Sequence, residues 1–481
     1  MKLLNRLEEY SKSPAYPFHM PGHKRRMDSL DPRLPWQLDI TEIDGFDNLH
    51  SPSGILKDGM DRAARLYHSR RTFFLVNGST CGILAAVCAA TAPGDTVLMA
   101  RGCHKSVYHA VELRGLTPVY LMPSWDDSFG VFGSITPAAV EQALCGNPKI
   151  RLVILTSPTY EGVLSDIAAI AQIAHRHGVP LLVDEAHGAH LGFDSRFPQS
   201  AVALGADIVI QSLHKTLPSL TQTALAHLGG EMIDERRFAR QLAVFETSSP
   251  SYLLMGSIES CLELLKSPQE LFSPYWERLE RFSGAMKQLQ NLRVLCCGED
   301  SPARHPAFFA FDPSKLVIST KGTGLTGPAL SQLLRERYRL ELEMAMGDYA
   351  LAMTSVCDTD EGFTRLSGAL LAVDAQTGAK AAAKASPIVP RLPRQRLIPA
   401  KAALLPGSPT PTPDCGGLTS AQSVWAYPPG IPLLVPGEEI SQEFLLQMQE
   451  LENQGVALYG DYGSPAESLR TLDLTQQDFY G

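Results

Sequence analysis

The stretch that decides the fold is Leu181–His187, which reads Leu-Leu-Val-Asp-Glu-Ala-His. A short apolar run stops abruptly at Asp184, which is the pattern of a buried strand that ends in a polar residue. Three runs of this kind predict strands with polar residues just beyond their ends: Leu152–Thr156, Leu181–Val183 and Asp207–Gln211. In open parallel sheets, ligands bind beyond the carboxyl ends of the strands. If these strands are neighbours, the residues that follow them converge on one site.

The surrounding sequence repeats the alternation of strand and helix. Further strands are predicted at Thr72–Val76, Thr96–Ala100 and Pro118–Leu121, and helices at Thr80–Thr91 and Asp166–His177. Short apolar strands separated by helices are typical of parallel βαβ crossovers. The sequence therefore predicts an α/β fold with a mostly parallel sheet.

The rest of the chain differs from this pattern and suggests further domains. Residues 1–55 are rich in Pro, Gly, His and Asp, and we interpret them as an arm that wraps its own body or a partner subunit; residues 56–300 form the large domain. A smaller α+β unit is expected at 301–373, with a strand at Ala307–Phe311 and a helix at Gly327–Arg337. Residues 374–416, with an Ala/Lys tract and Ser-Pro-Thr-Pro-Thr-Pro at 408–413, are predicted to be a mobile linker. Residues 417–481 return to a compact composition.

Composition narrows the class of protein. The 481 residues are 44% hydrophobic and 19% charged, with a net charge of −9, which argues against a nucleic-acid-coating protein. No apolar run is long enough for a transmembrane helix, and residues 1–10 do not resemble a signal peptide. Nine cysteines without a Cys-x-x-Cys pair favour reduced thiols and a cytoplasmic location.

Lys215 and Asp184 are the residues that most strongly indicate a type of chemistry. Lys215 follows an apolar strand, where desolvation would lower its pKa and make it a nucleophilic amine suited to a Schiff base. Asp184 could then keep a pyridinium nitrogen protonated. Taken singly, Lys215 reads as a surface lysine at a loop start, and Asp184 as a loop cap, a metal ligand or a partner for a buried cation.

Asn77-Gly78-Ser79-Thr80, before the predicted helix at Thr80–Thr91, could bind a phosphate. Glycine allows close approach of the backbone, and a helix N-terminus offers free N–H groups. Ser212 and His214 could contribute from the opposite side. The alternative is an ordinary Ser/Thr helix cap, which is the commoner case.

Histidines near the strand ends have two interpretations. His104 could stack on a planar cofactor and shuttle protons, or it could simply hydrogen-bond within its loop. His187 and His190 invite a metal site, but His175 and His177 fall at the end of a predicted helix, at the other edge of the sheet, and the cysteines offer no ligand spacing, so we predict no metal. Four acids are candidates for holding a distal cation of a substrate, with solvated acids or salt-bridge partners as the simpler explanation: Glu42, Asp44, Asp47 and Glu438.

Ordered motifs along the chain resemble those of the ornithine/lysine/arginine decarboxylase family, which has the fold-type-I pyridoxal-phosphate architecture. They run in family order over most of the sequence: Phe18–Lys24, Asp39–Glu42, Asp47–His50, Asn77–Thr80, His104–Ser106, Thr156–Gly162, Val183–Gly188, Ser212–Thr216, Leu220–Gln222, Thr247–Pro250 and Tyr427–Pro432. The resemblance is to the short form of the family, without an N-terminal wing domain. It implies an aspartate-aminotransferase-like large domain with a smaller α+β C-terminal domain.

The resemblance also implies a reaction and roles for individual residues. The expected reaction is α-decarboxylation of arginine, lysine or ornithine to the corresponding polyamine-pathway amine and CO2, with pyridoxal 5'-phosphate as cofactor. Lys215 would link covalently to the cofactor, Asp184 would pair with the ring nitrogen, and His104 would stack on the ring. Four residues would hold the phosphate: Ser79, Thr80, Ser212 and His214. His187 would lie near the ring, and Thr247 and Ser248 would come from the partner subunit of a homodimer.

Other functions stay open at this stage. Aminotransfer or another lyase reaction could run on the same cofactor, although no arginine clamp for a carboxylate is evident around Arg365 or Arg391. A homologue without activity, acting as a binding partner, is a second possibility, and a metal hydrolase is a distant third. Neither the choice among the three basic amino acids nor assembly beyond a dimer can be inferred from the sequence.

Overall fold

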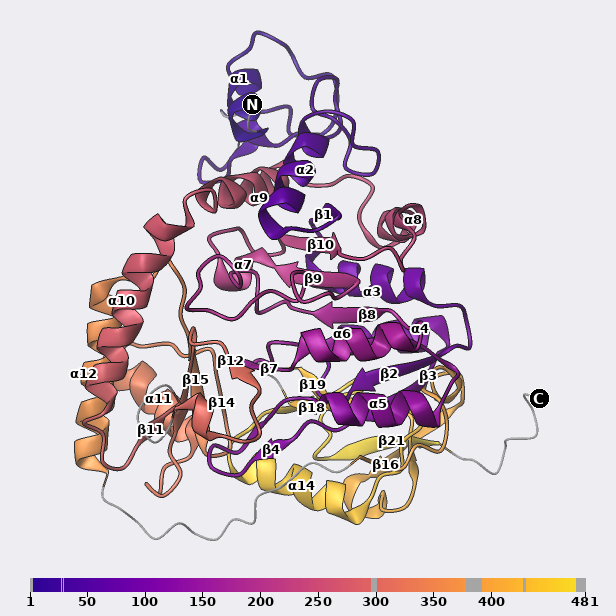
Figure 1. Ribbon diagram of the computed structural model, residues 1–481, viewed down its shortest axis with the longest axis vertical. Coiled ribbons are helices and arrows are strands. Elements are labelled where there is room, and N and C mark those ends of the chain that lie inside the picture. Colours follow the sequence, from indigo (N-terminus) through magenta and orange to yellow (C-terminus); the bar gives the residue numbers. More distant parts are fainter. Residues whose placement is uncertain are drawn as a thin grey trace. The chain divides into compact units, whose positions relative to one another are not determined.

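The computed structural model describes residues 3–26, 28, 30–295, 301–377, 392–426 and 430–472. The chain divides into two compact units, one of residues 1–90 and 167–274 and the other of residues 91–166 and 275–481. Each is described by itself (Figure 1). Among the described residues, no helix combines the length and apolar character that a membrane span requires.

The first unit contains four neighbouring strands. Their order is β1 (Arg71–Leu75), β10 (Ala224–Leu228), β9 (Ile208–Ser212) and β8 (Leu181–Asp184). β8 and β9 are parallel, whereas β10 runs antiparallel to both β9 and β1. The predicted strands at 181–183 and 207–211 are thus confirmed, but β10 was not foreseen because the chain turns back after β9 rather than crossing over through a long helix.

Helices of the first unit cover this set of strands. α3 (Gly78–Ala90) packs against β1, β10 and β9 and against α8 (Glu235–Phe245). Its many alanines allow this close packing, since almost all of its residues from 81 to 89 are buried. The unit also contains α1 (Leu3–Ser11), η1 (Trp36–Leu38), α2 (Ile55–Tyr67), α6 (Ile167–Arg176), α7 (Leu213–Thr216), α9 (Tyr252–Leu264) and the start of α10 (Pro268–Met286).

The second unit holds three parallel strands and two helices of the predicted βαβ pattern. β2 (Thr96–Ala100) lies between β3 (Thr117–Leu121) and β6 (Ile150–Thr156) and is parallel to both. α4 (Lys105–Arg114) connects β2 to β3, and α5 (Pro137–Gly146) precedes β6. Short strands complete this part: β4 (Trp125–Asp126), β5 (Val131–Phe132) and β7 (Val163–Leu164).

The predicted α+β unit is a four-stranded antiparallel sheet with helices. Its strand order is β11 (Arg293–Val294), β13 (Lys315–Ser319), β15 (Tyr349–Met353) and β14 (Met344–Met346). α11 (Gly327–Tyr338) starts where Thr326 caps the Ala329 N–H, and it packs against β14, β15 and α12 (Asp360–Gln376). The strand expected at 307–311 is shorter, β12 (Ala310–Phe311), after η3 (Pro302–Arg304).

The predicted linker is partly wrong. Its Ala/Lys tract lies outside the described residues, but β16 (Gly407–Pro411) and η4 (Thr412–Asp414) occupy the proline-rich run. Among the described strands, β16 pairs with β21 (Ser468–Leu472) alone, and the other neighbour of β21 is β17 (Thr419–Ser420). An edge strand tolerates proline because one side of it needs no N–H donors, and therefore the prolines did not exclude a strand.

The C-terminal region has its own core, as expected from its composition. β18 (Val424–Ala426) lies between β19 (Ile431–Leu434) and β20 (Leu458–Gly460). Buried residues of these strands pack with those of α14 (Gln442–Asn453), including Val424, Leu434, Phe444 and Met448. The short helix α13 (Pro399–Ala402) packs on α4.

Candidate active site

The strand register of the first unit aligns three chain segments that carry the predicted functional residues. Leu75 pairs with Ala224 and Ala224 pairs with Ser212, so the end of β1, the start of β10 and the end of β9 lie side by side. Asp184 at the end of β8 pairs with Ile210, two residues before Ser212. Two of the three predicted strand ends, those at Asp184 and Ser212, therefore lie close together in this unit, whereas the third, at Thr156, belongs to the second unit.

Lys215, His187 and Asp184 form the centre of this site. The Nζ of Lys215 lies 3.0 Å from Nε2 of His187. Asp184 is buried, and one of its oxygens accepts a hydrogen bond from the Ala186 N–H at 3.1 Å. Burial raises the pKa of the Asp184 carboxyl, and the nearby Lys215 opposes that shift. A buried acid whose charge is balanced by a lysine suits the pairing inferred from the sequence.

The predicted phosphate cup lies at the start of α3. Gly78 has φ of 73°, a conformation that favours glycine, and its N–H donates to the carbonyl of Gln222 at 2.9 Å. The next residues, Ser79 and Thr80, begin the helix and are not buried. Gln222 itself has φ of 85°, a costly conformation for a residue with a side chain. The loop before β10 is thus held in an unusual shape against the cup.

Ser212 and its neighbours adjoin this loop. His214 donates from Nδ1 to the Thr223 carbonyl at 2.9 Å, and burial lowers the pKa of its imidazole. The hydroxyls of Ser212 and Thr216 are buried, and they have no hydrogen-bond partner among the described residues. Buried hydroxyls without partners are rare in native proteins. Their positions on either side of Lys215 fit a ligand that carries many acceptor oxygens, such as a phosphate ester.

A chain of hydrogen bonds begins next to Asp184 and connects buried polar residues of the first unit. The next residue, Glu185, accepts hydrogen bonds from Ser200 Oγ, the Ala201 N–H and Gln211 Nε2. Gln211 in turn accepts from His227, whose other ring nitrogen bonds Thr72. Burial raises the pKa of Glu185 to about 7 and lowers that of His227 to about 3. Sequence reasoning missed these residues, except that an isolated polar residue within an apolar strand could have drawn attention to Gln211.

His104 belongs to the second unit and caps a helix there. Its Nδ1 accepts from the Ser106 N–H at 3.2 Å at the start of α4, which corresponds to the simpler alternative for this residue. A side chain in a cap can still present its ring face to a ligand, so its stacking role stays a prediction.

Glu438 is placed differently from the substrate ligand suggested by the sequence. It is fully buried, and its two oxygens accept from the terminal nitrogens of Arg101 at 2.6 and 3.0 Å. The Val435 N–H donates to it as well, at 2.9 Å. Tyr108 donates to the Arg101 carbonyl, and its ring and that of Tyr120 lie against the guanidinium. These partners fit an internal ion pair better than a ligand for an external cation.

The arm residues proposed as substrate ligands have mixed surroundings. Asp47 accepts hydrogen bonds from the backbone N–H groups of Ser53, Gly54 and Leu56, so it holds the start of α2. These hydrogen bonds lower the pKa of its carboxyl against the opposing effect of burial. Asp44 is exposed, as are Thr247 and Ser248. His50 bonds the Thr247 carbonyl at 2.8 Å and so connects the arm with that segment.

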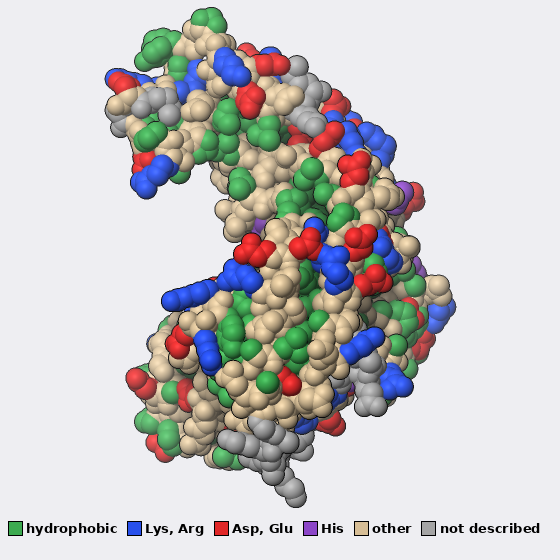
Figure 2. All heavy atoms as spheres, turned by 90° about the vertical axis from the view of Figure 1, so that its left-hand side faces the viewer, with side chains coloured by type: hydrophobic (Ala, Val, Ile, Leu, Met, Phe, Trp, Pro, Cys, Tyr) green, Lys and Arg blue, Asp and Glu red, His purple; other side chains and the backbone are tan. Residues whose placement is uncertain are grey.

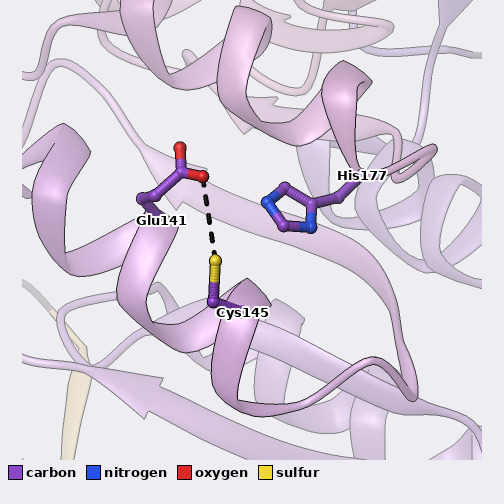
Figure 3. Close-up of side chains that lie close together, drawn as sticks. All are labelled: Glu141, Cys145 and His177. Carbon is purple, nitrogen blue, oxygen red and sulfur yellow. Dashed lines mark hydrogen bonds between the residues drawn. The ribbon is translucent and has the colours of Figure 1, made fainter.

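Among the described residues, His187 and His190 do not belong to a group of three or more potential metal ligands. His190 is buried, with its ring edge-on to Phe197. Figure 3 shows the Cys145 thiol and the Glu141 carboxylate of α5, with Sγ and Oε1 3.8 Å apart. Two ligands are too few for a structural or catalytic zinc site, and His177, also drawn, belongs to the other unit. We assign no metal to these residues.

The parallel strands, the lysine beside a buried aspartate and the glycine-containing cup are features of a fold-type-I pyridoxal-phosphate-dependent enzyme. Comparison with known proteins gives the family. The model for the Orn/Lys/Arg decarboxylase major domain matches residues 2–331, and that for the C-terminal domain matches residues 410–455. The chain belongs to the Orn/Lys/Arg decarboxylase family, which implies pyridoxal 5'-phosphate as cofactor.

Individual relatives agree with this assignment. The arginine decarboxylase of Bacillus subtilis is 30% identical over 97% of this chain and 96% of its own length. That of Halalkalibacterium halodurans is 31% identical over 96% of both chains. The crystal structure of the Francisella novicida lysine decarboxylase LdcF superposes with a TM-score of 0.82 at 19% identity, covering 98% of this chain and 81% of that one. The expected fold class is thus confirmed.

Proposed function

We propose that this protein is a pyridoxal-phosphate-dependent decarboxylase of a basic amino acid and that arginine is its preferred substrate. The observation that carries the proposal is the placement of Lys215 beside His187 and the buried Asp184, together with the hydroxyls of Ser212 and Thr216, which have no partner among the described residues. Membership of the family supports the type of reaction. Two relatives that match over nearly their whole length are named arginine decarboxylases, which supports arginine.

The cofactor, when bound, supplies an electron sink for the bond that loses CO2. Lys215 would hold it covalently through Nζ. The Asp184 carboxylate would keep the ring nitrogen protonated, because a buried negative charge is stabilised by a proton shared with a nearby base. His187, in contact with Lys215, would orient the amine and could hold a proton at Nε2.

The cup would bind the phosphate through the N–H groups at the start of α3 and the hydroxyls of Ser79, Thr80 and Ser212. A helix N-terminus is favourable for anions because its N–H groups lack partners within the helix. His214 would complete this set of donors. His104 would stack on the ring, as the resemblance implies, and either His104 or Lys215 would return a proton to the carbon that has lost CO2.

We further propose that the functional form is a homodimer. The arm exposes large hydrophobic side chains, which are costly to leave in water: Tyr16, Phe18, Met20 and Leu34 are each at least half exposed. Figure 2 shows hydrophobic side chains on this segment, at the top of the view. A second copy that covers them would also bring Thr247 and Ser248 to its partner's site.

The first experiment is a product assay. The purified protein, supplied with pyridoxal 5'-phosphate, is incubated with arginine, lysine and ornithine, and CO2, amines and keto acids are measured. We expect CO2 and agmatine from arginine as the main products. Keto acid without CO2 would support aminotransfer instead.

Variants make the assay specific. K215A should lose both turnover and the near-visible absorbance of the lysine-bound cofactor. K57A is the matched control, because Lys57 pairs with Asp61 on α2 and should not affect either. Normal turnover in K215A would refute the proposal. To test the dimer, the molar mass of the parent protein and of F18D is measured by light scattering. F18D should have the lower mass. A monomeric mass for the parent protein would refute the proposed dimer.

A further inference from the structure

We propose that Glu246 is a positioning residue that shapes the phosphate cup and makes its affinity for the cofactor phosphate depend on pH. This inference rests on the proposed function, since it concerns the same cup. Glu246 follows the last residue of α8, directly before Thr247. No feature of the sequence drew attention to it.

Hydrogen bonds tie Glu246 to the backbone that leads into the cup. The Val76 N–H donates to its Oε1 at 2.7 Å, and the Asn77 N–H donates to the carboxylate as well. These are the two residues before Gly78, whose own N–H is taken by Gln222. The three successive N–H groups before Ser79 are therefore fixed by partners from two other segments. The free donors that start at Ser79 are oriented as a consequence.

The Glu246 carboxylate also places a negative charge close to the cup that would bind the anionic phosphate. Glu246 is only 7% exposed, so water screens its charge poorly. Burial raises the pKa of its carboxyl to about 7, although the two N–H groups oppose that shift. A phosphate that binds nearby carries a like charge and would raise this pKa further. Phosphate binding and proton uptake by Glu246 are therefore coupled, because each favours the other.

The neighbouring ionisable groups do not offset this charge. From α3, the Cys81 thiol faces Glu246, and burial together with this carboxylate raises the pKa of that thiol, so it stays neutral. From the arm, His50 bonds the carbonyl of Thr247 rather than the carboxylate. On α8, Arg237 donates to the Cys88 carbonyl on α3.

The direction of the effect follows from the sign of the charge. Below about pH 7 the carboxyl is neutral, and its carbonyl oxygen still accepts from the loop. Above that value the negative charge weakens phosphate binding. Glutamine in this position keeps an acceptor and never ionises, so E246Q should bind the cofactor almost equally well at low pH and better than the parent protein at high pH.

The experiment measures cofactor affinity rather than turnover. Full-length apoprotein of the parent, E246Q and E246A is titrated with pyridoxal 5'-phosphate from pH 6 to pH 9, and Kd is read from the near-visible absorbance and from protein fluorescence. Cofactor ionisation and imine formation are common to all three proteins. The ratio of the parent Kd to the E246Q Kd therefore reports the effect of the Glu246 charge. We expect this ratio to rise about three- to tenfold across the range. E246A should bind more weakly than E246Q at every pH.

The outcomes separate this inference from the proposed function. If the parent and E246Q give parallel pH profiles while the parent binds the cofactor and releases CO2, this inference is wrong and the proposed function stands. If the parent shows no near-visible absorbance at any pH, the proposed function fails first. If E246A does not fold, the comparison of the parent with E246Q still decides. Uptake of a proton on cofactor binding at pH 7.5, seen as a buffer-dependent heat in calorimetry, should occur in the parent and be smaller in E246Q.

Discussion

Two buried acids in this chain each lie near a cation, and their surroundings differ. In the second unit, Glu438 receives three hydrogen bonds, two of them from Arg101, and the guanidinium also donates to the Leu433 carbonyl. In the first unit, Asp184 accepts a hydrogen bond from the backbone N–H of Ala186, and the hydroxyls of Ser212 and Thr216 beside Lys215 have no partner among the described residues.

The difference separates a structural ion pair from a binding site. Desolvation of a charge costs several kcal/mol, so a buried pair is stable only when additional hydrogen bonds satisfy it. Glu438 and Arg101 meet that condition, and therefore they connect the C-terminal region to the end of β2. Near Lys215, in contrast, the buried hydroxyls of Ser212 and Thr216 have no hydrogen-bond partner among the described residues. Buried polar groups that lack hydrogen-bond partners thus indicate a binding site. Buried polar groups with a full set of partners do not.

The largest expected effect comes from removing the acid of the binding site. D184A should lower kcat by about 10³-fold or more, because the negative charge of Asp184 would stabilise the protonated cofactor ring during the reaction. D184N should lose nearly as much, since the amide has the same shape but no charge. Steady-state kinetics with arginine would measure both. A D184N variant with nearly normal kcat would show that the charge is not required and would break the comparison.

The next effect concerns the structural pair. E438A should destabilise the fold by about 3–5 kcal/mol, because it leaves the Arg101 cation buried without its partner. The double variant R101L/E438L should recover most of that loss. Denaturant unfolding monitored by fluorescence and circular dichroism would measure it. If E438Q instead kept full stability and raised KM for arginine about tenfold, Glu438 would be the substrate ligand that the sequence suggested.

The sequence predicts those parts of the fold that depend on local patterns. The strand at Thr96–Ala100 has the same bounds in the structure, and the helix from Gly327 begins at the Thr326 cap and extends one residue beyond the prediction. Such elements follow from periodicity and capping, which are local properties. β10 and β16 were missed because their pairing partners, rather than their own residues, determine that they are strands.

The site was predictable to the same extent. Lys215, Asp184 and Ser212 were found because they follow apolar strands, where position along the chain implies position at the end of the sheet. The contacts that hold them were not found. Val76 and Glu246 are separated by 170 positions and Arg101 and Glu438 by 337, so only the folded chain brings them together.

A third prediction uses Glu185, which accepts three hydrogen bonds, as Glu438 does, but has no cation partner among the described residues. Burial raises the pKa of its carboxyl to about 7 from its ordinary value of 4.5. A group whose pKa is raised in the folded state binds its proton more tightly there, so its ionisation costs stability as the pH rises from about 4.5 through about 7. The free energy of unfolding should fall by about 2–3 kcal/mol over that range relative to E185Q. Parallel pH profiles of the two proteins would show that Glu185 ionises normally.

The smallest expected effect comes from comparing two serine hydroxyls, one that has no hydrogen-bond partner among the described residues and one that has a partner. S212A removes a hydroxyl without a partner, so stability should stay the same or rise slightly, whereas cofactor Kd should rise about tenfold through loss of one donor to an anion. S200A is the matched control, because the Ser200 hydroxyl donates to Glu185 at 2.7 Å. It should lower stability by about 1–2 kcal/mol and leave cofactor Kd unchanged. Thermal unfolding and cofactor titration of both variants would measure the two effects. A stability loss in S212A equal to that in S200A would mean that Ser212 stabilises the fold and does not bind the ligand.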